Sequence, residues 1–186
     1  MGKRAKTNYL FFASESHAII DWVERSSHDL AVAANRLRAL TDERAIAATM
    51  ARYGHAIDLG HDDDWVACFV DDGEYDILYG RFEPRRLALG RRHTGGVLHK
   101  GRRQLAAFVA GQSRPSAGIH KHLLFSPLSA VEGDRATASS CFIRADMTSE
   151  GPEVQSFGTY RDRWRREAGS RWLIERREVA IDGMRS

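Results

Sequence analysis

The chain has 186 residues, 42% of them hydrophobic and 28% charged, which is enough to bury one good core but hardly a second. The formal net charge is +3 and the pI is about 9.1. Basic and acidic residues nevertheless alternate, as in Arg161-Asp162-Arg163, which is more typical of a solvated strand face than of a nucleic-acid-binding track. From this charge pattern we expect no nucleic-acid partner. Cys68 and Cys141 lack the spacing of a zinc site or a disulfide scaffold, so we expect a cytoplasmic protein.

The first forty residues are expected to form a partly helical extension. The apolar run at Tyr9–Ala13 is too short for the core of a signal peptide or for a membrane span, so we expect neither secretion nor a membrane partner. Residues 17–40 carry enough apolar side chains for one or two amphipathic helices. We interpret residues 1–40 as a segment that packs on the domain or on a neighbouring subunit.

A single domain is expected over residues 41–186, beginning with a helix at Thr41. Thr41 is a typical helix cap, acidic residues follow it, and apolar residues then recur at helical spacing, at Ile46, Met50, Tyr53 and Ile57. A neighbouring stripe of small residues ends in Asp58. The small residues could leave a void that Asp58 faces, or they could simply allow close packing, with Asp58 starting a polar turn.

The rest of the chain predicts short helices followed by long strands. We expect a short helix at Asp63–Phe69, a strand at Glu74–Gly80, an exposed loop over residues 81–100 and a helix at Arg102–Ala110. Four long segments of strand-forming residues, joined by hairpin turns, follow at Ile119–Val131, Arg135–Met147, Val154–Arg165 and Arg171–Ile181. This order predicts an α+β domain whose helices cover one face of a curved sheet, with bends at Gly118, Pro127 and Gly158.

Asp58 and His122 are the residues most suggestive of chemistry. If the fold sets them side by side, the carboxylate can orient the imidazole and stabilise its charge, which makes a base able to take a proton from carbon. His120 lies two residues before His122 and so shares its strand face, which leaves a metal triad with Asp58 as an alternative. Because Gly118 starts the strand, we expect His120 at the mouth or edge of a pocket and no metal.

The chain resembles the SnoaL-like branch of the nuclear-transport-factor-like superfamily over residues 41–181. The resemblance rests on the order and spacing of several segments: Asp58 to Asp71-Asp72-Gly73, Lys121-His122-Leu123-Leu124, the hairpin Val131–Ala136, Gly158-Thr159-Tyr160, and a closing strand after Arg171-Trp172. It implies a cone-shaped fold, in which a strongly curved mixed or antiparallel sheet and about three helices surround a deep apolar pocket.

The resemblance also implies roles for individual residues. Scytalone dehydratase and hexachlorocyclohexane dehydrochlorinase carry an aspartate and a histidine at the positions of Asp58 and His122, and there the histidine removes a proton from carbon while the aspartate holds the ring. Scytalone dehydratase has a second histidine where this chain has Ser139 or Ser140, which argues against the same substrate. Residues expected to line a substrate pocket are Tyr53, Trp65, Phe69, Tyr75, His120, Ser140 and Phe142, although a Tyr of this kind could equally be a core ring.

Two functions are therefore open. The first is a cofactor-independent lyase or isomerase acting on a small apolar, polycyclic or aromatic molecule. The second is a non-catalytic role, either as a carrier of hydrophobic ligands or as a structural subunit like the small subunit of ring-hydroxylating dioxygenases. Either would be consistent with a homo-oligomer, a dimer or trimer, because an open sheet with an exposed face usually pairs.

Overall fold

The computed structural model describes residues 7–79, 97–112 and 118–184, with side-chain detail from residue 22 onward except at positions 126 and 170. The chain divides into two compact units, residues 1–41 and 42–186. The helix α1, Thr7–Leu59, supplies the described part of the first unit and the first element of the second. No helix in the described part of the chain is both long and apolar enough to cross a membrane.

The helix does not begin at Thr41, contrary to expectation. The Thr41 hydroxyl donates a hydrogen bond to the carbonyl oxygen of Leu37, 2.8 Å away, as it does inside a continuous helix. The physical reason is that no glycine or proline interrupts residues 7–53, so nothing stops the helix before this point. The acidic residue that suggested a helix start, Asp42, instead accepts two hydrogen bonds from Arg166 and one from Trp172 Nε1.

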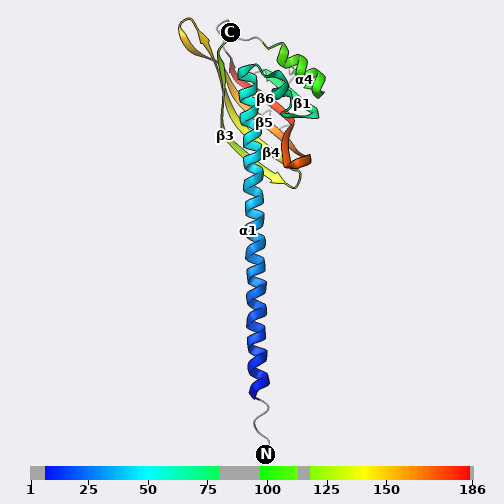
Figure 1. The fold of residues 1–186 in the computed structure, drawn as a ribbon. Coiled ribbons are helices and arrows are strands. Elements are labelled where there is room, and N and C mark those ends of the chain that lie inside the picture. Colours follow the sequence, from blue (N-terminus) through cyan, green and yellow to red (C-terminus); the bar gives the residue numbers. More distant parts are fainter. Residues whose placement is uncertain (1–6, 80–96, 113–117, 185–186) are drawn as a thin grey trace, which may run out of the picture. The chain divides into compact units, whose positions relative to one another are not determined.

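A six-stranded sheet forms most of the second unit, with strands in the order β2-β1-β6-β5-β4-β3. Strands β1 and β6 are parallel and all other neighbours are antiparallel. Figure 1 shows the long strands β3 to β6 side by side and α4 close to β1. The strands are β1 Phe69–Tyr79, β2 Val97–Lys100, β3 His120–Glu132, β4 Arg135–Thr148, β5 Gly151–Glu167 and β6 Arg171–Met184.

The α+β architecture predicted from the sequence is confirmed, with differences at element boundaries. Within the described ranges, the helices after α1 are α2, Asp62–Val66, and α4, Gly101–Ala110, and a 3₁₀ turn, η1, spans Ala168–Ser170. Strand β1 begins earlier than expected, and β2 lies in the segment expected to be a loop because it finds backbone partners along β1. The remainder of that loop, residues 80–96, lies outside the described residues.

Alternation along the strands places the core on one face of the sheet. In β4, Ala136, Ala138, Ser140 and Phe142 are buried and the residues between them are exposed. The helical stripe at Ile46, Met50, Tyr53 and Ile57 is buried in the same hydrophobic cluster, at 0–9% exposure. Helix α1 therefore packs its predicted apolar stripe in the core of the second unit.

Two of the three predicted bends coincide with irregular strand pairing. The pairing of β3 with β4 shifts between Phe125 and Leu128, around Pro127, which has no N–H to donate to the ladder. The pairing of β5 with β6 shifts between Phe157 and Gly158. A side chain at Gly158 would place its Cβ 2.0 Å from the Ala180 carbonyl oxygen, so the two strands approach each other only because this residue is glycine.

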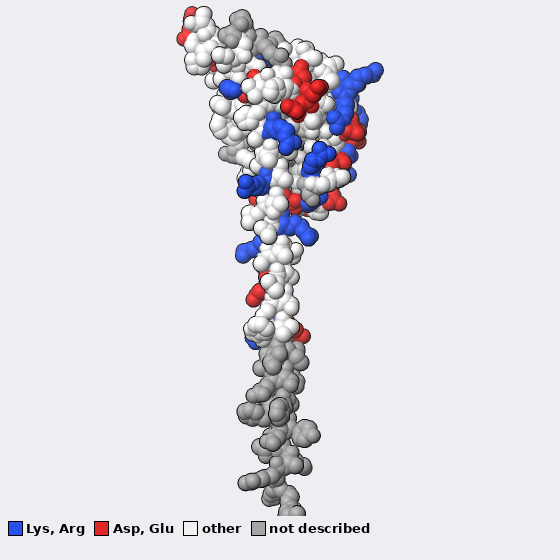
Figure 2. Space-filling view, viewed as in Figure 1, with Lys and Arg blue, Asp and Glu red and all other residues white. Residues whose placement is uncertain are grey.

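The visible surface of the second unit carries both signs of charge. Figure 2 shows basic and acidic side chains intermixed on this face of the second unit. The alternation of charge seen in the sequence thus produces a mixed surface on this face.

Candidate functional site

Asp58 and His122 are in direct contact. Asp58 Oδ1 lies 2.8 Å from His122 Nδ1 and accepts a second hydrogen bond from the His122 backbone N–H at 2.9 Å. Asp58 comes from the last turn of α1 and His122 from the beginning of β3. The two side chains are only 5% and 10% exposed, so the structure brings this predicted pair together in a sheltered position.

A small residue on α1 allows the helix to approach β3 at this point. A Cβ at Gly54 would lie 3.1 Å from Leu124 Cδ1 and 3.6 Å from the His122 carbonyl oxygen. A larger side chain there would push the helix away from the strand, and with it the carboxylate one turn later. Of the small residues in the stripe that ends in Asp58, Gly54 is buried and serves close packing, whereas Ala47 and Ala51 are exposed. The close approach at Gly54 brings Asp58 to the histidine.

The electrostatics of the pair favour an ionised carboxylate. Burial alone would raise the pKa of Asp58, but the hydrogen bonds and charge of His122, with a smaller effect of Lys121, lower it below its usual value. Lys121 Nζ lies 3.8 Å from Asp58 Oδ2. Because an ionised carboxylate can only accept, His122 Nδ1 carries the proton, which leaves the lone pair of a neutral ring on Nε2.

His120 is buried at 5% exposure, because strand pairing begins at this residue and α1 covers it. Its expected place at the mouth or edge of a pocket stays a prediction. Its Nε2 donates a hydrogen bond to the Ile57 carbonyl oxygen at 3.1 Å, and its ring lies edge-on to that of His122, 5.6 Å between centroids. Burial lowers the pKa of His120, which favours the neutral ring. Its Nδ1 has no hydrogen-bond partner among the described residues.

The same residues form the donor set that could hold a metal. Asp58, His120 and His122 each offer a ligand atom, and the three atoms lie within 4.8 Å of one another. Two histidines and one carboxylate suit a transition metal, and the Ile57 carbonyl fixes the orientation of His120 as a second-shell group would. A metal that used His122 Nδ1 would have to displace the proton that now bonds Asp58. The hydrogen-bonded pair and a metal triad built on His122 Nδ1 are thus mutually exclusive uses of that ring nitrogen.

Four of the aromatic residues expected to line a pocket contact one another in the core. Tyr53, Trp65 and Phe69 are each 0% exposed and Tyr75 is 5% exposed. The ring centroids of Tyr53 and Trp65 lie 5.5 Å apart, and those of Trp65 and Tyr75 lie 5.4 Å apart. The Tyr53 hydroxyl donates to the Tyr75 hydroxyl at 3.2 Å, and burial raises the pKa of Tyr75 well above its usual value, so this phenol stays protonated.

The other two expected lining residues, Ser140 and Phe142, face the same interior from β4. Phe142 stacks on Tyr160 with 4.5 Å between ring centroids. The Ser140 hydroxyl is buried and has no hydrogen-bond partner among the described residues. Ser140 is therefore an interior donor of the kind that a bound oxygen would satisfy.

The sequence reasoning missed a buried ion pair between Arg177 and Asp162. Both side chains are 0% exposed, and two guanidinium nitrogens donate to the carboxylate at 2.8 and 2.7 Å. The guanidinium carbon of Arg177 also lies 4.2 Å from the ring centroids of both Tyr53 and Tyr160. Burial disfavours its charge, but Asp162 and the two tyrosines hold the pKa of Arg177 above its usual range.

The available signal for this pair was strand alternation. Asp162 lies between Tyr160 and Trp164 at every second position of β5, and both of those rings are buried. The Arg161-Asp162-Arg163 run is thus only partly the solvated face that its charges suggested, because its central residue points into the core. One Arg177 nitrogen, Nη1, has no hydrogen-bond partner among the described residues.

Comparison with known proteins identifies the family. A model of the SnoaL-like domain matches residues 38–178. The chain belongs to the SnoaL-like domain family. Among curated proteins, none is similar enough in sequence to count as a match.

Solved structures share the fold of this SnoaL-like domain. An NTF2-like protein with a cystatin-like fold from Novosphingobium aromaticivorans is 29% identical, with a TM-score of 0.66 over 80% of this chain and 86% of that one. The beta subunit of a proposed aromatic-ring-hydroxylating dioxygenase from the same organism is 22% identical, with a TM-score of 0.65 over 79% and 93% of the two chains. A proposed scytalone dehydratase from that organism is 20% identical, with a TM-score of 0.57 over 77% and 85%.

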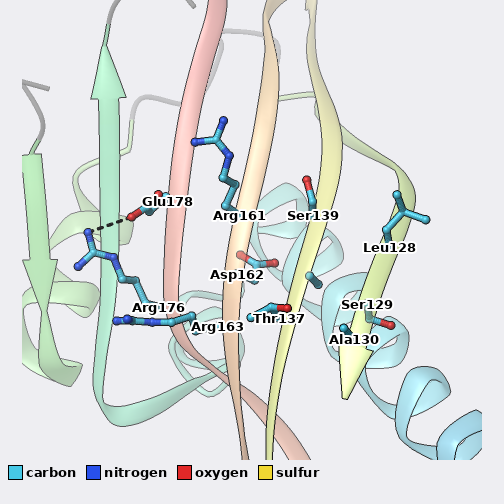
Figure 3. A pocket seen from close by; sticks show the side chains of 11 residues that line it. Leu128, Ser129, Ala130, Thr137, Ser139, Arg161, Asp162, Arg163, Arg176 and Glu178 are labelled. Atoms are coloured by element: carbon cyan, nitrogen blue, oxygen red, sulfur yellow. Dashed lines mark ion pairs between the residues drawn. The ribbon is translucent and has the colours of Figure 1, made fainter. Parts of the chain in front are cut away.

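A cavity of about 580 Å³ lies on the opposite face of the SnoaL-like sheet from the buried core. Figure 3 shows it lined by outward-facing side chains of β3 to β6, among them Leu128, Ser139, Arg161, Arg176 and Glu178. Neither this cavity nor a smaller one of about 350 Å³ beside it is lined by any of the predicted site residues. A deep pocket next to Asp58 and His122 therefore stays a prediction.

Proposed function

We propose that this SnoaL-like protein is a cofactor-independent lyase or isomerase that eliminates a leaving group from, or moves a proton within, a small apolar, polycyclic or aromatic substrate. The proposal is supported above all by one observation, the 2.8 Å contact between Asp58 Oδ1 and His122 Nδ1 in a sheltered position. His122 is the base in this proposal, and Asp58 holds its ring.

The chemistry follows from the protonation state of the pair. His122 Nε2 takes a proton from a carbon of the substrate, and the imidazolium formed is stabilised by the ionised Asp58. The electron pair of the broken C–H bond then forms a double bond, as a leaving group departs from the adjacent carbon or as an enolate accumulates. A positioned base of this kind supplies roughly a hundred- to ten-thousand-fold in rate.

Donors for a developing negative charge are available in the interior. The Ser140 hydroxyl and Arg177 Nη1 are buried, and neither has a hydrogen-bond partner among the described residues. A substrate oxygen in the interior would satisfy these groups, and pre-positioned donors of this kind stabilise oxyanions. The substrate we propose is therefore apolar over most of its surface and carries at least one oxygen.

One observation favours the second candidate, a non-catalytic ligand carrier or structural subunit. The expected lining residues Tyr53, Trp65 and Phe69 are 0% exposed and pack against one another, as in a filled core. The similarity to a dioxygenase beta subunit is at the level of fold and is consistent with a structural role.

The experiment that separates the two candidates begins with a thermal-shift screen against hydroxylated aromatics, steroids and polyketides. Each stabilising compound is then incubated with the protein in D₂O, and its carbon-bound hydrogens are followed by NMR and mass spectrometry. A base of the proposed kind introduces solvent-derived deuterium into the compound or gives an eliminated product.

His122→Gln should abolish that conversion without loss of thermal stability, whereas His55→Gln, at an exposed position on α1, should leave it unchanged. Conversion that survives His122→Gln would remove the proposed mechanism, and binding without any conversion would favour the carrier.

A further inference from the structure

The part of α1 that precedes the second unit carries a solvent-exposed apolar stripe. Val23, Leu30, Leu37 and Leu40 are 48%, 72%, 67% and 64% exposed. An ordinary helix of a folded protein buries such residues, because removing the apolar surface of a Leu or Val side chain from water is favourable.

The stripe has the spacing of a coiled coil. Val23, Leu30 and Leu37 follow one another at intervals of seven, which is the a position of a heptad, and Ser26, Ala33 and Leu40 take the d position. All six lie on one face of a helix that has no glycine or proline before Gly54. A heptad of this kind is the pattern by which a helix pairs with another helix rather than with a sheet.

We propose that residues 23–40 of α1 pair with the same segment of a second copy in an antiparallel coiled coil. This interface is independent of the proposed chemistry at Asp58 and His122, because it uses only the unit that contains residues 1–41.

Side-chain size favours the antiparallel direction. In an antiparallel pair an a residue faces a d residue of the other helix, so Leu30 would face Ala33 and Leu37 would face Ser26, each large side chain against a small one. In a parallel pair like faces like, so Ser26 would meet Ser26 and Ala33 would meet Ala33, which leaves these two layers poorly filled.

Charge favours the same direction. Asp29 and Arg36 occupy the g positions that flank the stripe, and in an antiparallel pair g positions face each other. Each Asp29 would therefore lie beside an Arg36 of the other helix, twice in the dimer. In a parallel pair each g residue faces an e position, and the e residues here are Ser27, Ala34 and Thr41, which carry no charge.

A charge swap on the full-length protein tests the direction as well as the contact. Asp29→Arg places two like-charge pairs in the dimer and should raise its dissociation constant about tenfold. The double variant D29R/R36D should restore the dissociation constant, and an equimolar mixture of D29R with R36D should form mixed dimers in preference to either homodimer. Sedimentation over a concentration series measures all three. Arg38→Asp, which changes charge at an exposed position away from the stripe, is the matched control and should change little.

Cysteine trapping provides a second test of direction. In a Cys141→Ser background, which removes the exposed native thiol, mixing Leu30→Cys with Ala33→Cys should give a mixed disulfide, because residues 30 and 33 face each other. A parallel pair would instead give disulfides between identical chains.

The outcomes that overturn the proposal are distinct. The double variant L30E/L37E keeps good helix formers and leaves the second unit untouched, so it should fold, as checked by circular dichroism. Its molar mass in solution should be lower than that of the wild type, because the coiled-coil contact is lost. A molar mass that L30E/L37E leaves unchanged, a wild-type protein that is monomeric throughout, or a D29R dimer that R36D does not restore would each contradict the proposed antiparallel pair.

Discussion

One oxygen of Asp58 holds His122 at two points, the ring nitrogen Nδ1 at 2.8 Å and the backbone N–H at 2.9 Å. The backbone contact fixes the strand against the end of α1, and the ring contact fixes the rotation of the imidazole. The same carboxylate thus positions both the main chain and the side chain of the proposed base.

Asp58→Asn is expected to change the tautomer of His122. The amide oxygen can still accept from the backbone N–H, but an ionised acceptor for Nδ1–H is lost, so the proton should move in part to Nε2. Nitrogen chemical shifts of a ¹⁵N-histidine-labelled protein report this directly and need no substrate. For any substrate found, turnover should fall roughly a hundred- to ten-thousand-fold.

The control for this prediction is Asp63→Asn, which changes an exposed carboxylate of α2 by the same chemistry. It should alter neither the histidine shifts nor turnover. An Asp58→Asn protein whose His122 remained fully protonated on Nδ1 would show that the carboxylate does not set the tautomer.

Cys68 should be unreactive in the folded protein. Burial raises the pKa of its thiol from 9.0 to about 11, against smaller lowering effects of Arg52 and Arg177, so almost no thiolate exists near neutral pH. Because the folded pKa exceeds the unfolded one, the folded chain holds the proton longer, and the stability this contributes is present below about pH 9 and is lost as pH rises toward 11.

Mass spectrometry after iodoacetamide treatment at about pH 8 measures this difference. Exposed Cys141 should be alkylated in the native protein, and Cys68 only after unfolding in denaturant. Rapid native alkylation of Cys68 would mean that this part of the core opens far more readily than its 0% exposure indicates.

The architecture could be predicted because its signals are local. Each long strand alternates buried and exposed residues and ends at a turn sequence, and the helical stripe at Ile46, Met50, Tyr53 and Ile57 is continuous over three turns. By contrast, β2 exists because β1 offers it backbone partners, which no local pattern in a segment rich in Arg, His and Gly reveals. The helix runs through Thr41 because a residue that can cap a helix does not end one: its hydroxyl bonds the Leu37 carbonyl inside the helix, and no glycine or proline precedes it from residue 7 onward.

The candidate site was predictable only in part. Resemblance to a family paired Asp58 with His122, and their contact is present in the structure, whereas their catalytic role stays a prediction. Arg177 and Asp162 could not be found by composition, since charged residues within a charged strand look solvated until the strand's register is known. The burial of His120 likewise depends on the Ile57 carbonyl, which only the tertiary structure brings within 3.1 Å.

Removing one partner of the buried pair should strongly destabilise the fold. Arg177→Met leaves the Asp162 carboxylate buried without its cation, and loss of one member of such a pair typically costs about 3–5 kcal/mol. Urea unfolding followed by tryptophan fluorescence measures the change. The double variant R177M/D162L removes both charges and should recover most of the loss, because no unpaired charge then remains in the core. If the single and double variants were equally unstable, shape or the contacts of Arg177 with the two tyrosine rings, rather than the unpaired charge, would dominate the cost.

Gly158→Ala should be destabilising although it adds only one methyl group. The new Cβ would lie 2.0 Å from the Ala180 carbonyl oxygen and 2.9 Å from Phe142 Cε1, so β5 and β6 would have to separate where their pairing shifts. Overpacking of this kind costs about 1–3 kcal/mol of stability. We expect a cost at the upper end, because the backbone at Ala180 would have to move and not only a flexible side chain.

Gly111→Ala is the matched control, since its Cβ would meet its nearest neighbour at an ordinary 3.4 Å and its φ of −84° is open to alanine. Urea unfolding should show Gly111→Ala within about 1 kcal/mol of the wild type. Equal stability of the two variants would mean that the strands can part at Gly158 without loss, and the close approach there would then not be needed to bend the sheet.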